Sequence, residues 1–153
     1  MLTEGKKAPS FKLKDQNGND VSLKDFIGKQ IVMYFYPKDD TPGCTKEACS
    51  FRDNFPDFKD INAVILGVSP DSPASHKKFI SKYNLPFTLL SDENKEVLEK
   101  YEVWKEKNMY GKKYMGVERT TYIIDENGKI KKIFPKVKVD GHDKEVLEAI
   151  MKK

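Results

Sequence analysis

Apolar and polar positions along the chain follow two different periods, and the changes of period mark the predicted elements. Residues 11–23 alternate around Asn17-Gly18, which is the strongest short signal for a β-hairpin. Continuous apolar runs at 30–36 and 63–68 are typical of strands that are buried on both faces. Residues 87–90 predict a third buried strand.

Helical periodicity follows these strands. After the first buried strand, a helical pattern begins at Thr41-Pro42 and ends or kinks at Pro56. Its inward-facing positions are apolar: Ala48, Phe51 and Phe55. A second helix begins at Ser72-Pro73, with serine as the cap and proline at the first position, and runs to Tyr83.

The second half of the chain carries weaker signals. Residues 94–101 predict a short amphipathic helix, whereas 103–117 show no clear period and are expected to form a loop. Residues 119–124 and 129–134 predict a second hairpin around Asn127-Gly128.

A helix at 142–151, with Val146, Leu147 and Ile150 on one side, closes the chain. Strands that alternate with helices, followed by an antiparallel pair, predict an α/β fold with a mixed central sheet, helices on both faces and an N-terminal β-hairpin. At 153 residues, we expect one domain that spans residues 1–153.

Composition supports a packed core, because 38% of the residues are hydrophobic and nine are phenylalanine. The longest apolar stretches, 31–36 and 63–68, are far shorter than the roughly 20 residues that a membrane span requires. The N-terminus carries charges and lacks the apolar stretch of a secretory signal. We therefore expect a cytoplasmic protein with no membrane partner.

The net charge of +4 is a mild bias. A basic stripe lies in the second hairpin and beyond it: Lys129, Lys131, Lys132, Lys136 and Lys138. Because no nucleic-acid motif accompanies the stripe, a solvated strand face is the favoured interpretation, and no nucleic-acid partner is expected.

The two cysteines are the candidate chemical groups. Thr41 and Pro42 suit the cap and first position of a helix, which puts Cys44 in its first turn. Free amide donors and the helix dipole stabilise a thiolate there, and at such positions a thiol pKa falls from about 8.5 to roughly 3.5–7.5. On position alone, a small buried apolar residue is an equally good interpretation.

Cys49 follows five residues later. Along a regular helix this spacing separates the Cα atoms by nearly 9 Å, whereas a disulfide needs them within about 7 Å. Joining the two sulfurs would therefore require the first turn or two of the helix to unwind. The spacing argues against a Cys-x-x-Cys pair, and zinc is disfavoured because His76 and His142 are remote and no third thiol exists.

Residues 36–49 resemble the active-site segment of peroxiredoxins, in particular the bacterioferritin comigratory protein (BCP/PrxQ) branch. The specific pattern Pro-x-x-x-Thr-x-x-Cys runs from Pro37 to Cys44. The likeness extends over almost the whole chain: 51–53, 67–69, 109–112, 119–125 and 141–142. One departure is Glu102, where a glycine is expected.

The resemblance implies a thioredoxin-like fold and assigns roles to five residues. Cys44 would be the peroxidatic cysteine, Thr41 and Arg119 would bind and polarise the peroxide, and Pro37 would shield the thiolate from water. Cys49 would resolve the intermediate. These roles make physical sense, because negative charge builds on the departing oxygen and fixed donors aimed there lower the barrier.

Topology supports Arg119 independently. If its strand runs antiparallel to the strand at 30–36, its beginning lies at the sheet edge where that strand ends, beside Cys44. Glu47 could oppose ionisation of the thiol or orient Arg119, and a supporting structural role is favoured. We expect packing or surface roles for Trp104, His76 and His142.

The resemblance implies an atypical two-cysteine peroxiredoxin that reduces hydrogen peroxide and organic hydroperoxides. The reaction would pass through a sulfenic acid and an intramolecular Cys44–Cys49 disulfide, which thioredoxin or a similar thiol reductant would recycle. No metal, haem or flavin is required. The resemblance favours a monomer, and an intramolecular disulfide needs no partner chain, while a dimer through a sheet edge or a helix face stays open.

Two alternatives stay open at this point. One is a thiol-disulfide oxidoreductase on the same fold, which is disfavoured by the cysteine spacing. The other is a peptide- or nucleic-acid-binding domain with inert cysteines, which alkylation of the native protein at mildly acidic pH would distinguish.

Overall fold

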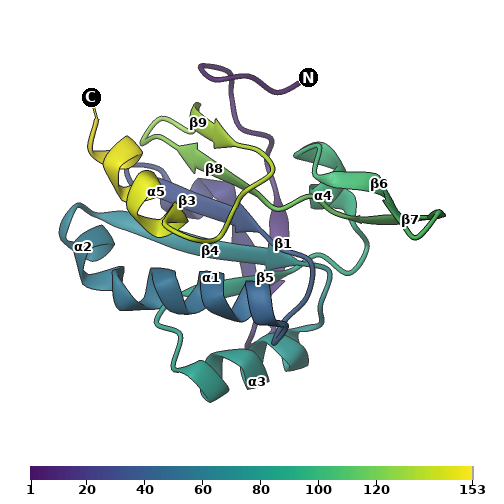
Figure 1. The fold of residues 1–153 in the computed structure, drawn as a ribbon. Coiled ribbons are helices and arrows are strands. Elements are labelled where there is room, and N and C mark those ends of the chain that lie inside the picture. Colours follow the sequence, from purple (N-terminus) through teal and green to yellow (C-terminus); the bar gives the residue numbers. More distant parts are fainter. Residues whose placement is uncertain (153) are drawn as a thin grey trace.

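A seven-stranded mixed sheet lies at the centre of the computed structural model, which describes residues 1–152 (Figure 1). Its strand order is β2-β1-β5-β4-β3-β8-β9. The strands are β1 (Lys12–Asp15), β2 (Asp20–Ser22), β3 (Gln30–Phe35), β4 (Ala63–Ser69), β5 (Thr88–Ser91), β8 (Thr120–Ile124) and β9 (Ile130–Phe134). β4 is parallel to β3 and β5, and the remaining pairs are antiparallel. The predicted mixed sheet and both predicted hairpins are confirmed.

Strand β3 is central because its side chains are apolar on both faces. Ile31, Met33 and Phe35 belong to one hydrophobic cluster, whereas Val32 and Tyr34 belong to the other. The continuous apolar run therefore divides between two cores with the strand period of two.

The helices are distributed unevenly over the two faces. α1 (Pro42–Asp53), α2 (Phe55–Asp60), α3 (Pro73–Tyr83) and α5 (His142–Met151) pack on the face that carries Val32 and Tyr34. The opposite face is covered by the short α4 (Glu96–Lys100), the 3₁₀ turn η1 (Leu23–Phe26) and the N-terminal segment. Figure 1 shows α1 and α3 side by side below the sheet. Among the described residues, no helix is long and apolar enough to cross a bilayer.

The helices α1 and α3 begin where the sequence predicts. Ser72 caps α3 as predicted, since its hydroxyl accepts from Ser75 N at 3.2 Å. Thr41 has the extended backbone of a cap, but its hydroxyl donates to the Lys38 carbonyl at 2.9 Å. Thr41 is thus the N-cap residue and Pro42 the first residue of α1, as predicted, while the Thr41 hydroxyl bonds within the preceding loop and not to the helix.

The segment expected to be a loop at 103–117 is a β-hairpin, so that prediction is wrong. β6 (Trp104–Met109) and β7 (Lys112–Val117) pair antiparallel around Tyr110-Gly111, both of which have positive φ. Most side chains of the hairpin are exposed on both faces, which removes the alternation that marks a half-buried strand. Figure 1 shows the hairpin projecting from the sheet.

The backbone explains why a glycine is expected at position 102. Glu102 has a φ of 61°, in the left-handed region that glycine adopts without a Cβ penalty. Its carboxylate accepts from Leu2 N at 2.9 Å, which ties the N-terminal segment to the turn after α4. The departure is therefore accommodated far from the cysteines.

We predict that Gly67→Ala lowers the free energy of unfolding by about 1–3 kcal/mol, because an added methyl overpacks the core. A Cβ at Gly67 would lie 2.6 Å from Leu89 Cδ2 and 2.9 Å from the Tyr34 ring. Urea denaturation measures the change. Gly116→Ala is the matched control, because there the methyl meets only the side chains of the half-buried Lys107 and the exposed Tyr114, at 3.3 Å. Equal stabilities of the two variants would contradict the prediction.

Candidate active site

The carboxyl end of β3 is where the candidate residues meet. β3 leads through the loop at 36–41 into α1, which carries both cysteines. β8 is antiparallel to β3, and Phe35 pairs with Thr120, so Arg119 lies at the same end of the sheet. The topology inferred for Arg119 is confirmed.

The guanidinium of Arg119 bridges two groups on successive turns of α1. Its Nη2 donates to Cys44 Sγ at 3.3 Å, and its Nη1 donates to Glu47 Oε1 at 2.7 Å. The Cys44 residue is only 2% exposed, and the Glu47 side chain only 1%. Gly43 leaves room for this arrangement, because a Cβ there would lie 3.3 Å from Arg119 Nη2. A cation and a helix N-terminus thus converge on one buried sulfur.

Glu47 competes with the sulfur for the same cation. Burial raises the pKa of Glu47 to about 7, and Arg119 only partly offsets this effect. Its second oxygen, Oε2, has no hydrogen-bond partner among the described residues. Burial also opposes the charge of Arg119, but Glu47 and Cys44 together raise the pKa of Arg119 above its ordinary value. Near neutral pH, protonation of Glu47 therefore changes how much of the Arg119 charge the sulfur experiences.

Aromatic side chains belong to the same core cluster as Cys44. Tyr34 packs against Phe51 of α1 and belongs to the same core cluster as Cys44. Burial raises the pKa of Tyr34 well above its ordinary value, and the negative charges of Glu47 and Cys44 add to the effect. Tyr34 therefore stays neutral beneath the sulfur.

Cys49 lies farther along the intact α1 and is partly exposed, and both cysteines are free. The helical spacing keeps the two Cα atoms about 9 Å apart. A bond between the sulfurs therefore requires a change in the α1 backbone, as the sequence predicts.

Thr41 and Pro37 are both half-buried and belong to the loop that precedes α1. The Thr41 hydroxyl donates within this loop, to Lys38. The roles of these two residues toward a peroxide stay predictions.

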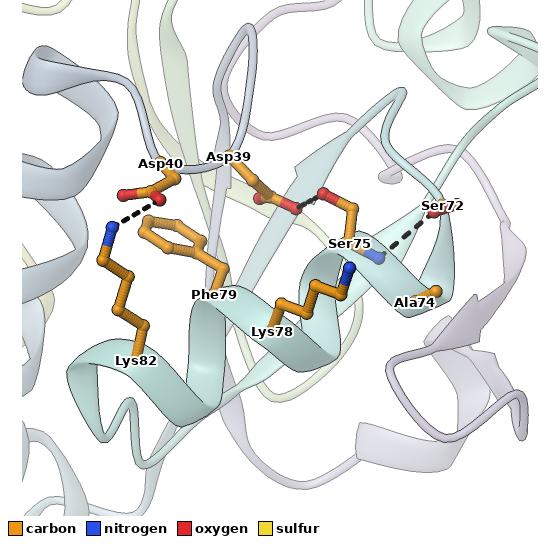
Figure 2. A pocket seen from close by; sticks show the side chains of 8 residues that line it. All are labelled: Asp39, Asp40, Ser72, Ala74, Ser75, Lys78, Phe79 and Lys82. Carbon is orange, nitrogen blue, oxygen red and sulfur yellow. Dashed lines mark hydrogen bonds and ion pairs between the residues drawn. The ribbon is translucent and has the colours of Figure 1, made fainter.

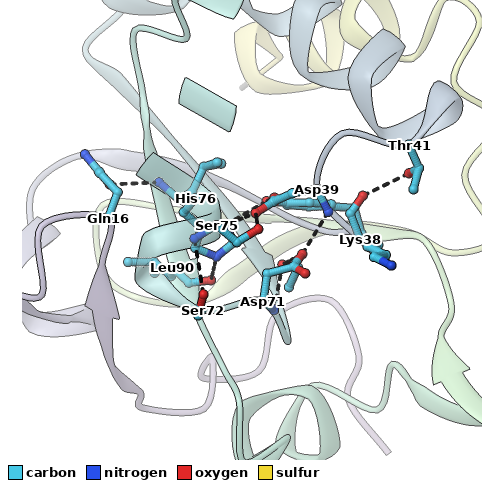
Figure 3. Close-up of polar contacts among 12 residues, drawn as sticks. Gln16, Lys38, Asp39, Thr41, Asp71, Ser72, Ser75, His76 and Leu90 are labelled. Atoms are coloured by element: carbon cyan, nitrogen blue, oxygen red, sulfur yellow. Dashed lines mark hydrogen bonds and ion pairs between the residues drawn. The ribbon is translucent and has the colours of Figure 1, made fainter. Parts of the chain in front are cut away.

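A buried polar network beside the site was not predicted from the sequence (Figure 3). His76, expected to be a packing or surface residue, is fully buried, with Nδ1 2.7 Å from Asp39 Oδ2 and Nε2 2.9 Å from the Leu90 carbonyl. Only the fold brings together side chains that are 37 positions apart, so the sequence offered no local signal for the pair.

Asp39, Asp71 and His76 also offer ligand atoms within 4.8 Å of one another, as a metal site would. These atoms are already occupied by hydrogen bonds. Asp39 accepts from Tyr36 and Ser75, and Asp71 accepts from Asp39 N. A cation would have to displace these donors, so the group fits a structural network better than a metal site.

The sequence matches known proteins over nearly its whole length. Residues 4–133 match the AhpC/TSA family. A protein named putative peroxiredoxin bcp from Coxiella burnetii is 56% identical over 94% of this chain and 95% of that protein. Peroxiredoxin Bcp from Bacillus subtilis is 52% identical over 95% of this chain and 93% of that protein.

Solved structures agree with the fold. A PrxQ cysteine-to-serine variant from Xylella fastidiosa superposes with a TM-score of 0.93 at 36% identity, covering 98% of this chain and 96% of that chain. A Xanthomonas campestris bacterioferritin comigratory protein, studied for its alkyl peroxide reduction activity, gives a TM-score of 0.91 at 39% identity, covering 97% of each chain. The predicted thioredoxin-like fold is confirmed.

We predict that Glu47→Gln flattens the pH dependence of stability. The raised pKa of Glu47 means that, between its ordinary value of 4.5 and about 7, the folded state holds a proton that the unfolded state has lost. Wild-type stability from this group is therefore complete at low pH and declines by about 3 kcal/mol as the pH rises through 7. Urea denaturation from acidic to mildly alkaline pH measures this slope, and parallel curves for wild type and variant would contradict the assignment.

Proposed function

The chain belongs to the AhpC/TSA family and, within it, to the Bcp/PrxQ peroxiredoxins, and from this premise we propose the residues by which it reduces a hydroperoxide. The protein is a thiol-dependent peroxidase of the two-cysteine type. The observation that carries the assignment is the 3.3 Å contact between Arg119 Nη2 and the sulfur in the first turn of α1.

In the first step, the Cys44 thiolate attacks one peroxide oxygen. An S–O bond forms, the O–O bond breaks, and the departing oxygen leaves as water or an alcohol after taking a proton. Cys44 becomes a sulfenic acid, oxidised by two electrons. Arg119 stabilises both the starting thiolate and the charge that grows on the leaving oxygen.

Thr41 and Pro37 complete this step in the proposal. Their positions in the loop between β3 and α1 support the assignment, because this loop leads directly into the turn that carries Cys44. Thr41 supplies a hydroxyl beside the peroxide, and Pro37 limits access of water to the sulfur.

In the second step, α1 unwinds and the Cys49 sulfur attacks the sulfenic acid. The S–S bond forms and water leaves. A dithiol reductant, thioredoxin or a protein like it, then returns the disulfide to two thiols through a mixed disulfide. Partial exposure of Cys49 supports this order, because the reductant must reach one of the two sulfurs.

The proposal includes a monomer that acts in the cytoplasm. An intramolecular disulfide needs no second chain, and a reducing compartment supplies the dithiol reductant. Hydrogen peroxide and organic hydroperoxides are the proposed substrates.

Peroxide consumption coupled to thioredoxin, thioredoxin reductase and NADPH tests the function. We expect NADPH oxidation that requires both the protein and the peroxide. Reduction of insulin disulfides without any use of peroxide would instead indicate a thiol-disulfide oxidoreductase.

We predict different outcomes for the two cysteine variants. Cys44→Ser abolishes peroxide consumption, because no attacking sulfur is left. Cys49→Ser consumes about one equivalent and then stalls, because the sulfenic acid has no resolving thiol. Peroxide titration with mass spectrometry of the protein measures both, and full turnover by Cys44→Ser would defeat the assignment.

We also predict that Arg119→Lys slows the reaction of Cys44 with peroxide by about 100-fold, the cost of losing one aimed donor in a charge-building step. The lysine keeps the positive charge but lacks the planar guanidinium whose two nitrogens donate to Cys44 and Glu47. Lys46→Met is the matched control, since Lys46 is an exposed cation on the same turns of α1 and pairs with Asp140. A loss in Lys46→Met without a loss in Arg119→Lys would show that only the general positive potential matters.

A further inference from the structure

The loop that precedes α1 is held by a buried polar network outside the cysteine site. Asp39 Oδ1 accepts from Tyr36 Oη at 2.5 Å, and Oδ2 accepts from Ser75 Oγ at 2.8 Å and lies 2.7 Å from His76 Nδ1. The main-chain N–H of Asp39 donates to Asp71 Oδ2 at 2.8 Å. We call these five residues the Asp39–His76 network (Figure 3).

His76 links this loop to the sheet. It lies in the first turns of α3, fully buried, and its Nε2 is 2.9 Å from the Leu90 carbonyl of β5. A carbonyl can only accept, so Nε2 donates to Leu90, while Nδ1 faces the Asp39 carboxylate. Both ring nitrogens are therefore committed to fixed partners.

α3 also holds the chain on either side of the helical turns that carry the cysteines. Asp40, with a φ of 58°, accepts from Lys82 Nζ at 2.8 Å (Figure 2). It also accepts from Tyr83 Oη at the end of α3, again at 2.8 Å. Near the end of α1, Arg52 Nη1 donates to the Tyr83 carbonyl at 2.7 Å. The exposed ion pair between Asp40 and Lys82 contributes little to stability. The attachment of the loop before α1 to α3 therefore depends mainly on the buried contacts of Asp39.

The disulfide step requires the turns between these attachments to change shape. The first turns of α1 must be helical for Cys44 to meet Arg119 and must unwind for Cys44 to reach Cys49. Because Asp39 fixes the loop to Ser75 and His76 of α3, the loop stays in place while the first turns of α1 unwind and refold.

We propose that Asp39 and His76 are positioning residues that hold the loop before α1, so that α1 favours the helical arrangement in which Arg119 contacts Cys44. This inference rests on the proposed Cys44–Cys49 disulfide. Loosening the pair shifts α1 toward the unwound arrangement, which slows the attack on peroxide and speeds disulfide formation. The two opposite changes are the signature of a positioning role.

Two variants at one position separate this role from packing. In His76→Gln, the amide nitrogen falls near the place of Nε2, so the link to Leu90 is kept and the link to Asp39 is lost. In His76→Asn, the amide nitrogen falls near Nδ1, so the link to Asp39 is kept. Asp39→Asn changes the other partner, because it replaces the carboxylate that faces His76 Nδ1 with an uncharged amide.

Rapid mixing with peroxide, quenched by alkylation and read by mass spectrometry, gives both rates. We expect His76→Gln and Asp39→Asn to slow peroxide attack about fivefold and to speed disulfide formation about fivefold, the effect of one lost net hydrogen bond. His76→Asn should stay within about twofold of wild type. Hydrogen exchange of the peptides covering residues 42–52 should quicken in the first two variants only.

Tyr122→Phe is the control for loss of stability, because it removes a buried donation to the Tyr101 carbonyl on the opposite face of the sheet. Its two rates should match wild type. Equal changes in His76→Gln and His76→Asn, or changes of the same sign in both steps, would overturn the inference. If the wild type forms no Cys44–Cys49 disulfide, the proposed function fails before the variants are compared.

Discussion

One arginine that donates to two acidic side chains is the contact on which the candidate site depends. The Arg119 guanidinium donates to Cys44 and to Glu47, and all three groups are largely withdrawn from water. In such surroundings a cation is costly unless it is paired, and each partner is costly without the cation. The arrangement therefore holds together as a unit, and the loss of any member leaves a buried charge or an orphaned donor.

Two features of the fold make this unit possible. The antiparallel pairing of β8 with β3 brings Arg119 to the end of the strand that leads into the cysteine helix. The absence of a side chain at Gly43 then lets the guanidinium approach the first turn of α1. Strand pairing and the small residue at position 43 take no part in a reaction, but together they fix the direction in which Arg119 donates its hydrogen bonds.

The sequence predicted most of this fold because its strongest signals are local. Apolar runs marked β3 and β4, and Ser72-Pro73 marked the beginning of α3. The β6–β7 hairpin was missed because an element exposed on both faces has no buried stripe to reveal it. The Asp39–His76 network was missed for a different reason, since hydrogen bonds between positions distant in sequence leave no periodic trace. The meeting of Cys44 and Arg119 was predictable because strand direction alone decides which ends of the strands coincide.

The late position of β8 in the chain has a consequence for biosynthesis. Cys44, its helix and five strands of the sheet leave the ribosome before Arg119, which follows Cys44 by 75 residues. Until β8 docks, β3 is an edge strand and the Cys44 sulfur lacks its contact with the Arg119 guanidinium. In the nascent polypeptide the thiol therefore has no cation beside it, and the pairing of β8 with β3 is the step that supplies one.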